Sequence, residues 1–236
     1  WVQTYSFMIQ AALKDTGLEN KILNPALHFR HREKVLLDDL DAVMKETFGI
    51  PRKRTDAALE AANEAQRTFE EKVEKRGSEI LAELPEDKQV AVILGRPYNT
   101  GDPELNLNLV HKMMNLDVVP IPVDFLPLSR ENIFGEYPLM YWPNGRKILE
   151  ACRIIARDDR LNAVHMGNFR CGPDSFIAHY VREEMRGKPY LQLEIDEHSA
   201  DAGMITRLEA FLDSLRGYQR VGGKLSSPRP PKGMTP

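Results

Sequence analysis

Cys171 is the residue whose type and position could most readily support chemistry in this sequence. It lies in residues 168–175 (NFRCGPDS), between a segment typical of a strand and a segment typical of a helix. The start of a helix carries about half a positive charge, which favours a thiolate or an anionic cluster. The sequence contains one other cysteine, so Cys171 cannot build a metal site alone. We expect it either to act with a partner, in metal ligation, nucleophilic catalysis or redox chemistry, or to be a buried turn cysteine.

Arg96 is the second candidate, in residues 95–99 (GRPYN), directly after a strand-like segment and a glycine. Its guanidinium could clamp a phosphate or carboxylate of a ligand. It could equally pair with a nearby carboxylate of the chain and brace the turn, and the sequence leaves both roles open. The run is not a phosphate-binding P-loop, because the spaced glycines and the Lys-Ser/Thr pair are absent.

The other candidates favour structural roles. Cys152 falls on an apolar helical stripe and is predicted to be a buried structural thiol. His165, within a strand, is predicted to be a core residue with satisfied hydrogen bonds. His198 lies in an acidic run that could bind a divalent ion but more often caps the next helix. Asp174 lies in a predicted first helical turn, where capping would also explain it.

The elements that must position these residues alternate between strands and helices. Four strands are predicted, at residues 89–94, 117–121, 162–166 and 189–195, with Pro120 suggesting that the second lies at an edge. Helices are predicted from near Asp102, from Asp174 to about residue 186, and over residues 200–216. This alternation predicts an α/β fold, a Rossmann-like (flavodoxin-like) parallel sheet of about four strands. Ligands bind beyond the carboxyl ends of such strands, where four distinctive segments fall, at residues 95–99, 124–127, 168–174 and 196–201.

The domain organisation follows from the same patterns. Residues 1–87 are predicted to form a mainly helical extension or bridge, with one long polar helix over residues 56–84 that contains Gly77. Residues 88–218 are predicted to form the Rossmann-like domain, and residues 219–236 a flexible tail. Residues 123–142 are rich in aromatic side chains and lack periodicity, which favours either a functional loop or an aromatic plug over the core.

Composition narrows the function classes. The formal net charge is −3, from 32 basic and 35 acidic residues, which gives no case for a nucleic-acid-binding face. No stretch approaches the length of a membrane span, and no secretory signal is recognisable. Two cysteines in such different settings do not suggest a disulfide scaffold, so a cytoplasmic location is expected. The chain begins with Trp1, and we interpret it as a fragment of a larger polypeptide.

Three runs carry a resemblance to a known family: residues 93–99 (ILGRPYN), 168–176 (NFRCGPDSF) and 187–203 (GKPYLQLEIDEHSADAG). They resemble the acyl-CoA dehydratase activase-related proteins. These are related to 2-hydroxyglutaryl-CoA dehydratase activators, 2-hydroxyacyl-CoA dehydratases, benzoyl-CoA reductases and double-cubane cluster proteins. The resemblance covers residues 88–215 well, residues 1–85 loosely, and the tail not at all.

The resemblance implies a low-potential electron-transfer role in anaerobic metabolism. Cys171 matches the cysteine before Gly-Pro-Asp that holds an iron–sulfur cluster in the related dehydratase subunits. The implied cofactor is a cluster, of 4Fe–4S type, shared with cysteines outside this chain. Arg96 and Cys171 would then meet at one site, and the residues expected to line it are Arg96, Tyr98, Asn99, Asn168, Gly172 and Asp174.

Two departures limit what the chain could do alone. A cubane cluster needs several thiolates, and the activator's nucleotide-binding part has no counterpart here. We therefore expect this chain not to be active as an enzyme by itself, but to work with other domains of the same polypeptide or with an ATP-dependent activator. Two alternatives stay open: a cluster-free module that binds a CoA thioester or another small molecule, and a structural docking domain that uses the helix at residues 56–84.

Overall fold

The computed structural model describes residues 2–14, 16–18, 21–29, 32–85, 87–220 and 222. Its contacts divide the chain into two units, Trp1–Phe69 and Glu70–Pro236, and the long helix α3 (Arg52–Glu83) contains the boundary. The domain limits predicted from the sequence stay a prediction. The predicted tail at residues 219–236 lies outside the described residues, except for residues 219 and 220, which end α8, and residue 222.

The first unit is helical. It contains α1 (Val2–Ala12), α2 (Glu33–Phe48) and the first part of α3. α2 ends at Gly49, which has a left-handed φ of 64° and whose amide donates to the carbonyl of Lys45 at 3.0 Å. Among the residues described in this unit, no hydrophobic side chain is buried. The packed core of the chain therefore belongs to the second unit.

The second unit is built on a parallel sheet, as the alternation of elements predicts. Its strands are β1 (Val90–Leu94), β2 (Val119–Pro122), β3 (Leu161–Asn168) and β4 (Tyr190–Ile195). All neighbouring pairs are parallel, in the order β2-β1-β3-β4. The predicted α/β fold class is confirmed. β2 is an edge strand, which agrees with the presence of Pro120. Proline has no amide hydrogen to donate to a neighbouring strand, so within sheets it is found at edges.

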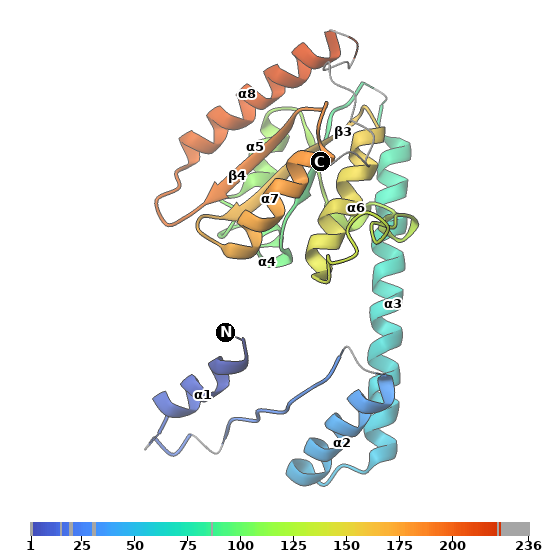
Figure 1. Cartoon of the computed structure of the whole chain (residues 1–236), viewed down its shortest axis with the longest axis vertical. Coiled ribbons are helices and arrows are strands. Elements are labelled where there is room, and N and C mark those ends of the chain that lie inside the picture. The colour runs from blue at the N-terminus through green and yellow to red at the C-terminus, as the bar shows by residue number, and fades with distance from the viewer. Residues whose placement is uncertain are drawn as a thin grey trace, which may run out of the picture. The chain divides into compact units, whose positions relative to one another are not determined.

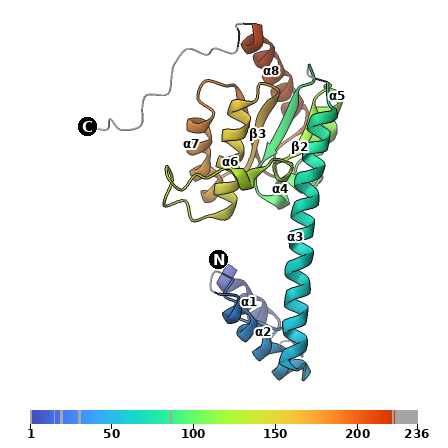
Figure 2. The same cartoon turned by 90° about the vertical axis from the view of Figure 1, so that its right-hand side faces the viewer.

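Helices cover both faces of this sheet (Figures 1 and 2). α6 (Pro143–Arg157) and α7 (Gly172–Glu184) pack on one face, and α5 (Leu109–Asn115) and α8 (Asp201–Arg220) pack on the other.

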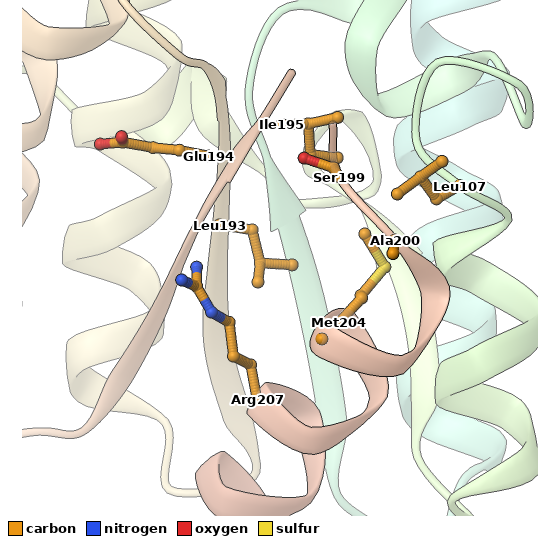
Figure 3. Close-up of a pocket in the computed structure, with 9 residues that line it drawn as sticks. Leu107, Leu193, Glu194, Ile195, Ser199, Ala200, Met204 and Arg207 are labelled. Atoms are coloured by element: carbon orange, nitrogen blue, oxygen red, sulfur yellow. The ribbon is translucent and has the colours of Figure 1, made fainter. Parts of the chain in front are cut away.

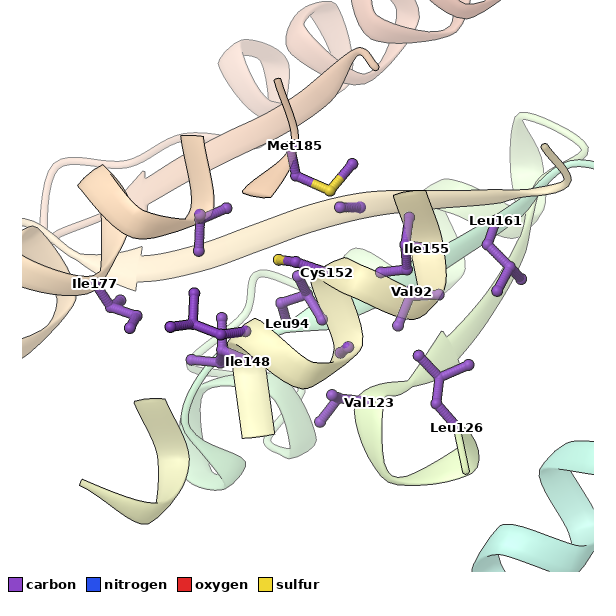
Figure 4. Packing of buried hydrophobic residues seen from close by; sticks show 14 of the residues in the cluster. Val92, Leu94, Val123, Leu126, Ile148, Cys152, Ile155, Leu161, Ile177 and Met185 are labelled. Carbon is purple, nitrogen blue, oxygen red and sulfur yellow. The ribbon is translucent and has the colours of Figure 1, made fainter. Parts of the chain in front are cut away.

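Cys152 lies on the buried side of α6 with no exposed surface, among the aliphatic side chains shown in Figure 4. Burial raises the pKa of its thiol far above the ordinary value. The prediction that Cys152 is buried is thereby confirmed.

The segment between β2 and α6 packs against the core. It contains the short turns η2 (Val123–Phe125) and η3 (Leu128–Arg130), and it buries Val123, Leu126, Ile133 and Met140. The hydroxyl of Tyr137 donates to the buried carboxylate of Glu184 in α7 at 2.6 Å. The segment is therefore a plug over the core, fixed by a buried polar contact, while Phe134, Leu139 and Tyr141 remain exposed.

One predicted helix is wrong at its start. The sequence predicts a helix from near Asp102, but α5 begins at Leu109, and residues 103–108 form turns. The carboxylate of Asp102 accepts from the amides of Glu104 and Leu105, which favours a turn over a helix. Leu107 and Asn108 then adopt left-handed φ values of 51° and 56°, which a helix cannot contain.

No helix among the described residues is long and apolar enough to cross a membrane.

Candidate functional site

The candidate site lies where the strand order of the sheet reverses. β1 is hydrogen-bonded to β2 on one side and to β3 on the other, so the chain leaves β1 and β3 toward opposite sides. Such a switch point opens a crevice at the carboxyl ends of the two strands. The residues that follow β1 and β3 are Gly95-Arg96 and Phe169-Arg170-Cys171. Strand order was not predictable from the sequence, yet it is what brings these two turns together.

Arg96, Cys171 and Asp174 form the centre of the site. One guanidinium nitrogen of Arg96, Nη2, donates to Cys171 Sγ at 3.1 Å and to Asp174 Oδ2 at 2.7 Å. The side chains of Arg96 and Asp174 are 15% and 8% exposed, so this ion pair is largely buried. The sequence left open whether Arg96 clamps a ligand or braces the turn. The structure shows a brace that also contacts the thiol.

Two further contacts hold Arg96 in place. Its guanidinium lies over the ring of Tyr98, 4.8 Å from the centroid. Asp174 Oδ2 also accepts the backbone amide of Asn168 at 2.8 Å, which fixes the carboxylate against the end of β3. Burial works against the charge of Arg96, but the hydrogen bond and the charge of Asp174 outweigh it and raise its pKa. Arg96 is therefore a permanent cation beside the sulfur.

The side chains of the two cysteines differ in their exposure to solvent. Cys171 is the N-cap residue of α7 and is partly exposed, whereas Cys152 is fully buried. The preceding Arg170 has a left-handed φ of 59°, and this turn directs the chain from β3 into α7. In the first turn of α7, Pro173 has no amide hydrogen, and the amides of Gly172 and Asp174 lie too near the start of the helix to find a partner within it. A soft anionic donor is well placed there.

The remaining predicted residues lie nearby in different ways. Asn168 contributes through its backbone, since its carbonyl accepts the amide of Cys171 at 3.0 Å. Asn99 is 2% exposed, and its Nδ2 has no hydrogen-bond partner. Gly172 is the first residue of α7, but a side chain there would meet open space.

A close approach does occur at Gly95. A Cβ atom at this position would lie 2.7 Å from the carbonyl oxygen of Met166, and its φ is 158°. Glycine thus lets the turn after β1 pass close to β3, which brings Arg96 toward Cys171. Gly167 has a similar role, since its added Cβ would lie 3.1 Å from the Cβ of Asp174.

The two other segments beyond the strand ends do not join this centre. Asp124 pairs with Lys147 of α6 at 2.5 Å. From the segment at residues 196–201, Ser199 and Ala200 border a separate hollow of about 150 Å³, which Figure 3 shows between the end of β4 and the start of α8. The hydroxyl of Ser199 accepts the backbone amide of Asp196 and donates to the Asp196 carboxylate, so the acidic run shapes a turn. Among the residues that the structure describes, no three His, Cys, Asp or Glu side chains gather closely enough to hold a metal ion.

His165 lies next to the site in β3 and is 2% exposed. Its Nδ1 has no hydrogen-bond partner, so the prediction of a buried residue holds but the prediction of satisfied hydrogen bonds is wrong. Burial lowers its pKa from 6.5 to about 4, although the carboxylate of Asp174 partly opposes this. The folded chain therefore keeps a neutral imidazole where the unfolded chain binds a proton.

This difference predicts an acid-sensitive stability. Between pH 6.5 and pH 4 the unfolded chain binds more protons than the folded chain, so the free energy of unfolding falls as pH falls. We expect a loss of about 2 kcal/mol between pH 7 and pH 5 from this residue. Urea unfolding at both pH values should show a smaller loss in His165→Gln than in the unchanged chain. An equal loss in both would show that His165 does not set this dependence; His198→Gln, an exposed histidine, is the matched control.

The fold and the site define a class of protein: a parallel α/β domain with a cysteine–arginine site at its topological switch point. A family profile described as CoA enzyme activase uncharacterised domain (DUF2229) matches residues 1–126, more than half of the chain. The chain belongs to this family. The matched residues include Arg96, Tyr98 and Asn99 and end before Cys171. No curated protein and no solved structure shows a significant match.

Proposed function

We propose that this chain contributes Cys171 to an iron–sulfur cluster that it shares with thiolates from another segment or chain. The observation that carries the proposal is the partly exposed sulfur at the switch point, with the buried cation of Arg96 at 3.1 Å. Membership of a CoA enzyme activase family supports a role beside a CoA-dependent enzyme. The relation to dehydratases and double-cubane proteins, drawn from the sequence runs, belongs to the same proposal.

The residues present fit one ligand position of such a cluster. Thiolates are the usual ligands of iron–sulfur clusters, and a cubane takes several of them. Cys171 supplies one, and Cys152 is enclosed in the core and cannot reach it without unfolding. The described residues thus fit a shared cluster and do not fit one held by this chain alone. When bound, a cluster of this kind supplies one-electron transfer.

The chain's own residues then have defined tasks. Arg96 donates a hydrogen bond to the sulfur of Cys171, and a hydrogen bond from a charged donor is stronger than one from a neutral donor. Hydrogen bonds to ligand sulfur are among the features by which a protein tunes a cluster. Asp174 holds Arg96 and balances its charge, and Tyr98 covers the guanidinium from the outer side.

The cluster-free alternative has less support at this site. A CoA phosphate would need a cation that is not already neutralised, but Arg96 is paired with Asp174 at 2.7 Å. A doubly charged phosphate would have to compete with that buried carboxylate and would meet its repulsion. The geometry therefore favours the interpretation in which Arg96 serves the sulfur.

Iron uptake tests the proposal. The chain is incubated anaerobically with iron, sulfide and an excess of 2-mercaptoethanol, which stands in for the missing thiolates, and is then separated from unbound iron. We expect protein-bound iron and a brown chromophore in the unchanged chain and in Cys152→Ala, and neither in Cys171→Ala. Equal iron in Cys171→Ala and in the unchanged chain would contradict the proposal. Circular dichroism checks that each variant is folded.

A further inference from the structure

The two edges of the sheet differ in their free backbone groups. At the β2 edge, the amide of Val119 donates to the carbonyl of Gln89 at 3.0 Å. Successive residues of a strand point their N–H and C=O groups to alternate sides, so Val119 and Ile121 both face β1. The residues of β2 that face outward are Pro120 and Pro122. Proline has no N–H group, so β2 offers no backbone donor to a strand beyond it.

The β4 edge is open. The amide of Phe169, at the end of β3, donates to the carbonyl of Ile195 at 3.0 Å, so Ile195 faces β3. By the same alternation, the residues of β4 that face away from β3 are Tyr190, Gln192 and Glu194. None of them is a proline, and no strand among the described residues pairs with this edge. Their N–H and C=O groups therefore form a template for the addition of another strand.

The connections of the fold do not lead to the β4 edge. On one face of the sheet, α6 and α7 carry the chain from β2 to β3 and from β3 to β4. On the other face, α5 carries the chain in the opposite direction, from β1 to β2. α8 packs on the same face as α5, so a right-handed connection through α8 leads back toward β2. A parallel strand reached through α8 would therefore not lie beyond β4.

The outward edge of β4 is complementary to itself. When two copies of β4 are antiparallel with Gln192 opposite Gln192, Tyr190 lies opposite Glu194, and every outward-facing residue is paired. The one charged side chain of this set thus meets a neutral phenol. On the other face, Leu191 lies opposite Leu193, and both belong to the apolar cluster beneath α8. A shift of two residues in either direction leaves Tyr190 or Glu194 without a partner in β4.

We propose that this chain forms a two-fold symmetric dimer in which the β4 edges of two copies pair antiparallel. The two sheets then form one mixed sheet, an arrangement that is common among large α/β sheets. Because the two copies of β4 run in opposite directions, the carboxyl ends of the strands lie at opposite edges of the joined sheet. The Cys171 sites of the two copies therefore face away from each other, and the dimer does not depend on iron binding.

Charge substitutions at Gln192 test this dimer on the whole chain. Since Gln192 lies opposite its own copy, Gln192→Glu and Gln192→Lys each bring two like charges together. We expect either variant alone to raise the dissociation constant of the dimer about tenfold or more in sedimentation equilibrium. An equal mixture of the two variants should restore association, because it places a carboxylate opposite an ammonium group. Gln219→Glu and Gln219→Lys, at an exposed position of α8, are the matched controls and should associate as the unchanged chain does.

Three results would overturn the proposal. One is a chain that stays monomeric at every concentration, and another is equal association of the Gln192 and Gln219 variants. The third is a tighter dimer in Glu194→Gln, which would indicate a register with Glu194 opposite its own copy; the proposed register predicts an unchanged dissociation constant. Urea unfolding checks that each variant is folded. Gln192→Lys should take up iron as the unchanged chain does, so the dimer and the cluster are tested separately.

Discussion

Replacement of Asp174 by alanine is expected to lower the free energy of unfolding by about 3–5 kcal/mol, because it leaves the buried charge of Arg96 without its partner. The same carboxylate oxygen accepts from Arg96 and from the amide of Asn168, so alanine removes both bonds at once. Asp174→Asn keeps an acceptor but not the charge, and we expect an intermediate loss. Denaturant unfolding, with Asp213→Ala as a control, measures these effects.

The Asp213→Ala control compares the loss of an exposed ion pair with the loss of a buried one. Asp213 pairs with Arg216 one turn away on α8, and their side chains are 74% and 67% exposed. An exposed pair of this kind contributes about 0–1 kcal/mol. If Asp174→Ala lowers the free energy of unfolding no more than Asp213→Ala does, the buried ion pair does not stabilise the site. The double variant Arg96→Ala/Asp174→Ala should recover part of the loss, since it removes the unpartnered charge.

Replacement of Gly77 by alanine is expected to destabilise the second unit by about 3 kcal/mol, although alanine is the better helix former. Gly77 lies within α3, and a Cβ atom there would be 2.0 Å from the carbonyl oxygen of Phe125. The contact is with backbone, so α3 or η2 would have to move to relieve it. That steric cost, about 4 kcal/mol, exceeds the gain of about 1 kcal/mol in helix propensity.

A second glycine gives the opposite sign. Gly217 lies in α8, and a Cβ atom there would meet nothing within 4 Å. Gly217→Ala should therefore stabilise the chain by about 0.5–1 kcal/mol. Thermal or urea unfolding of the two variants checks both signs. A stabilised Gly77→Ala would show that α3 does not pack on η2 as described.

Gly77 also shows a limit of reasoning from sequence. A glycine within a polar helical stretch predicts a weak point in the helix, because glycine loses more backbone entropy than other residues. The helix is continuous from Arg52 to Glu83, and the glycine serves a contact with a segment about fifty residues later. The helical period was visible in the sequence. The tertiary contact, which leaves no room for a side chain at this position, was not.

The sheet was predictable to within a few residues, because buried parallel strands have short apolar runs bounded by turn residues. β1 and β4 begin one residue later than expected, and β3 extends by one residue before and two residues after the predicted segment. The helix expected from Asp102 failed because side-chain and left-handed turns compete with helix over short distances. Strand order depends on pairing across the sheet, which periodicity does not encode.

The sequence predicted the residues of the candidate site better than it predicted the contacts between them. Arg96 and Cys171 follow two strands that pattern alone identifies, and the rule that ligands bind beyond strand ends places them on one edge. Asp174 offered a local explanation as a helix cap, but its carboxylate reaches Arg96, 78 residues away in sequence. Tyr137 and Glu184 gave no signal, since a buried carboxylate is recognisable only once its partners are in place.

Alkylation of the folded chain, read by peptide mass spectrometry, tests the central claim most directly. We predict that iodoacetamide labels Cys171 and leaves the buried Cys152 unlabelled until the chain is unfolded. Iron and sulfide added anaerobically with 2-mercaptoethanol should protect Cys171, and removal of the iron with a chelator should restore its labelling. Labelling of Cys171 to the same extent with and without iron and sulfide would contradict the claim that its sulfur is a cluster ligand.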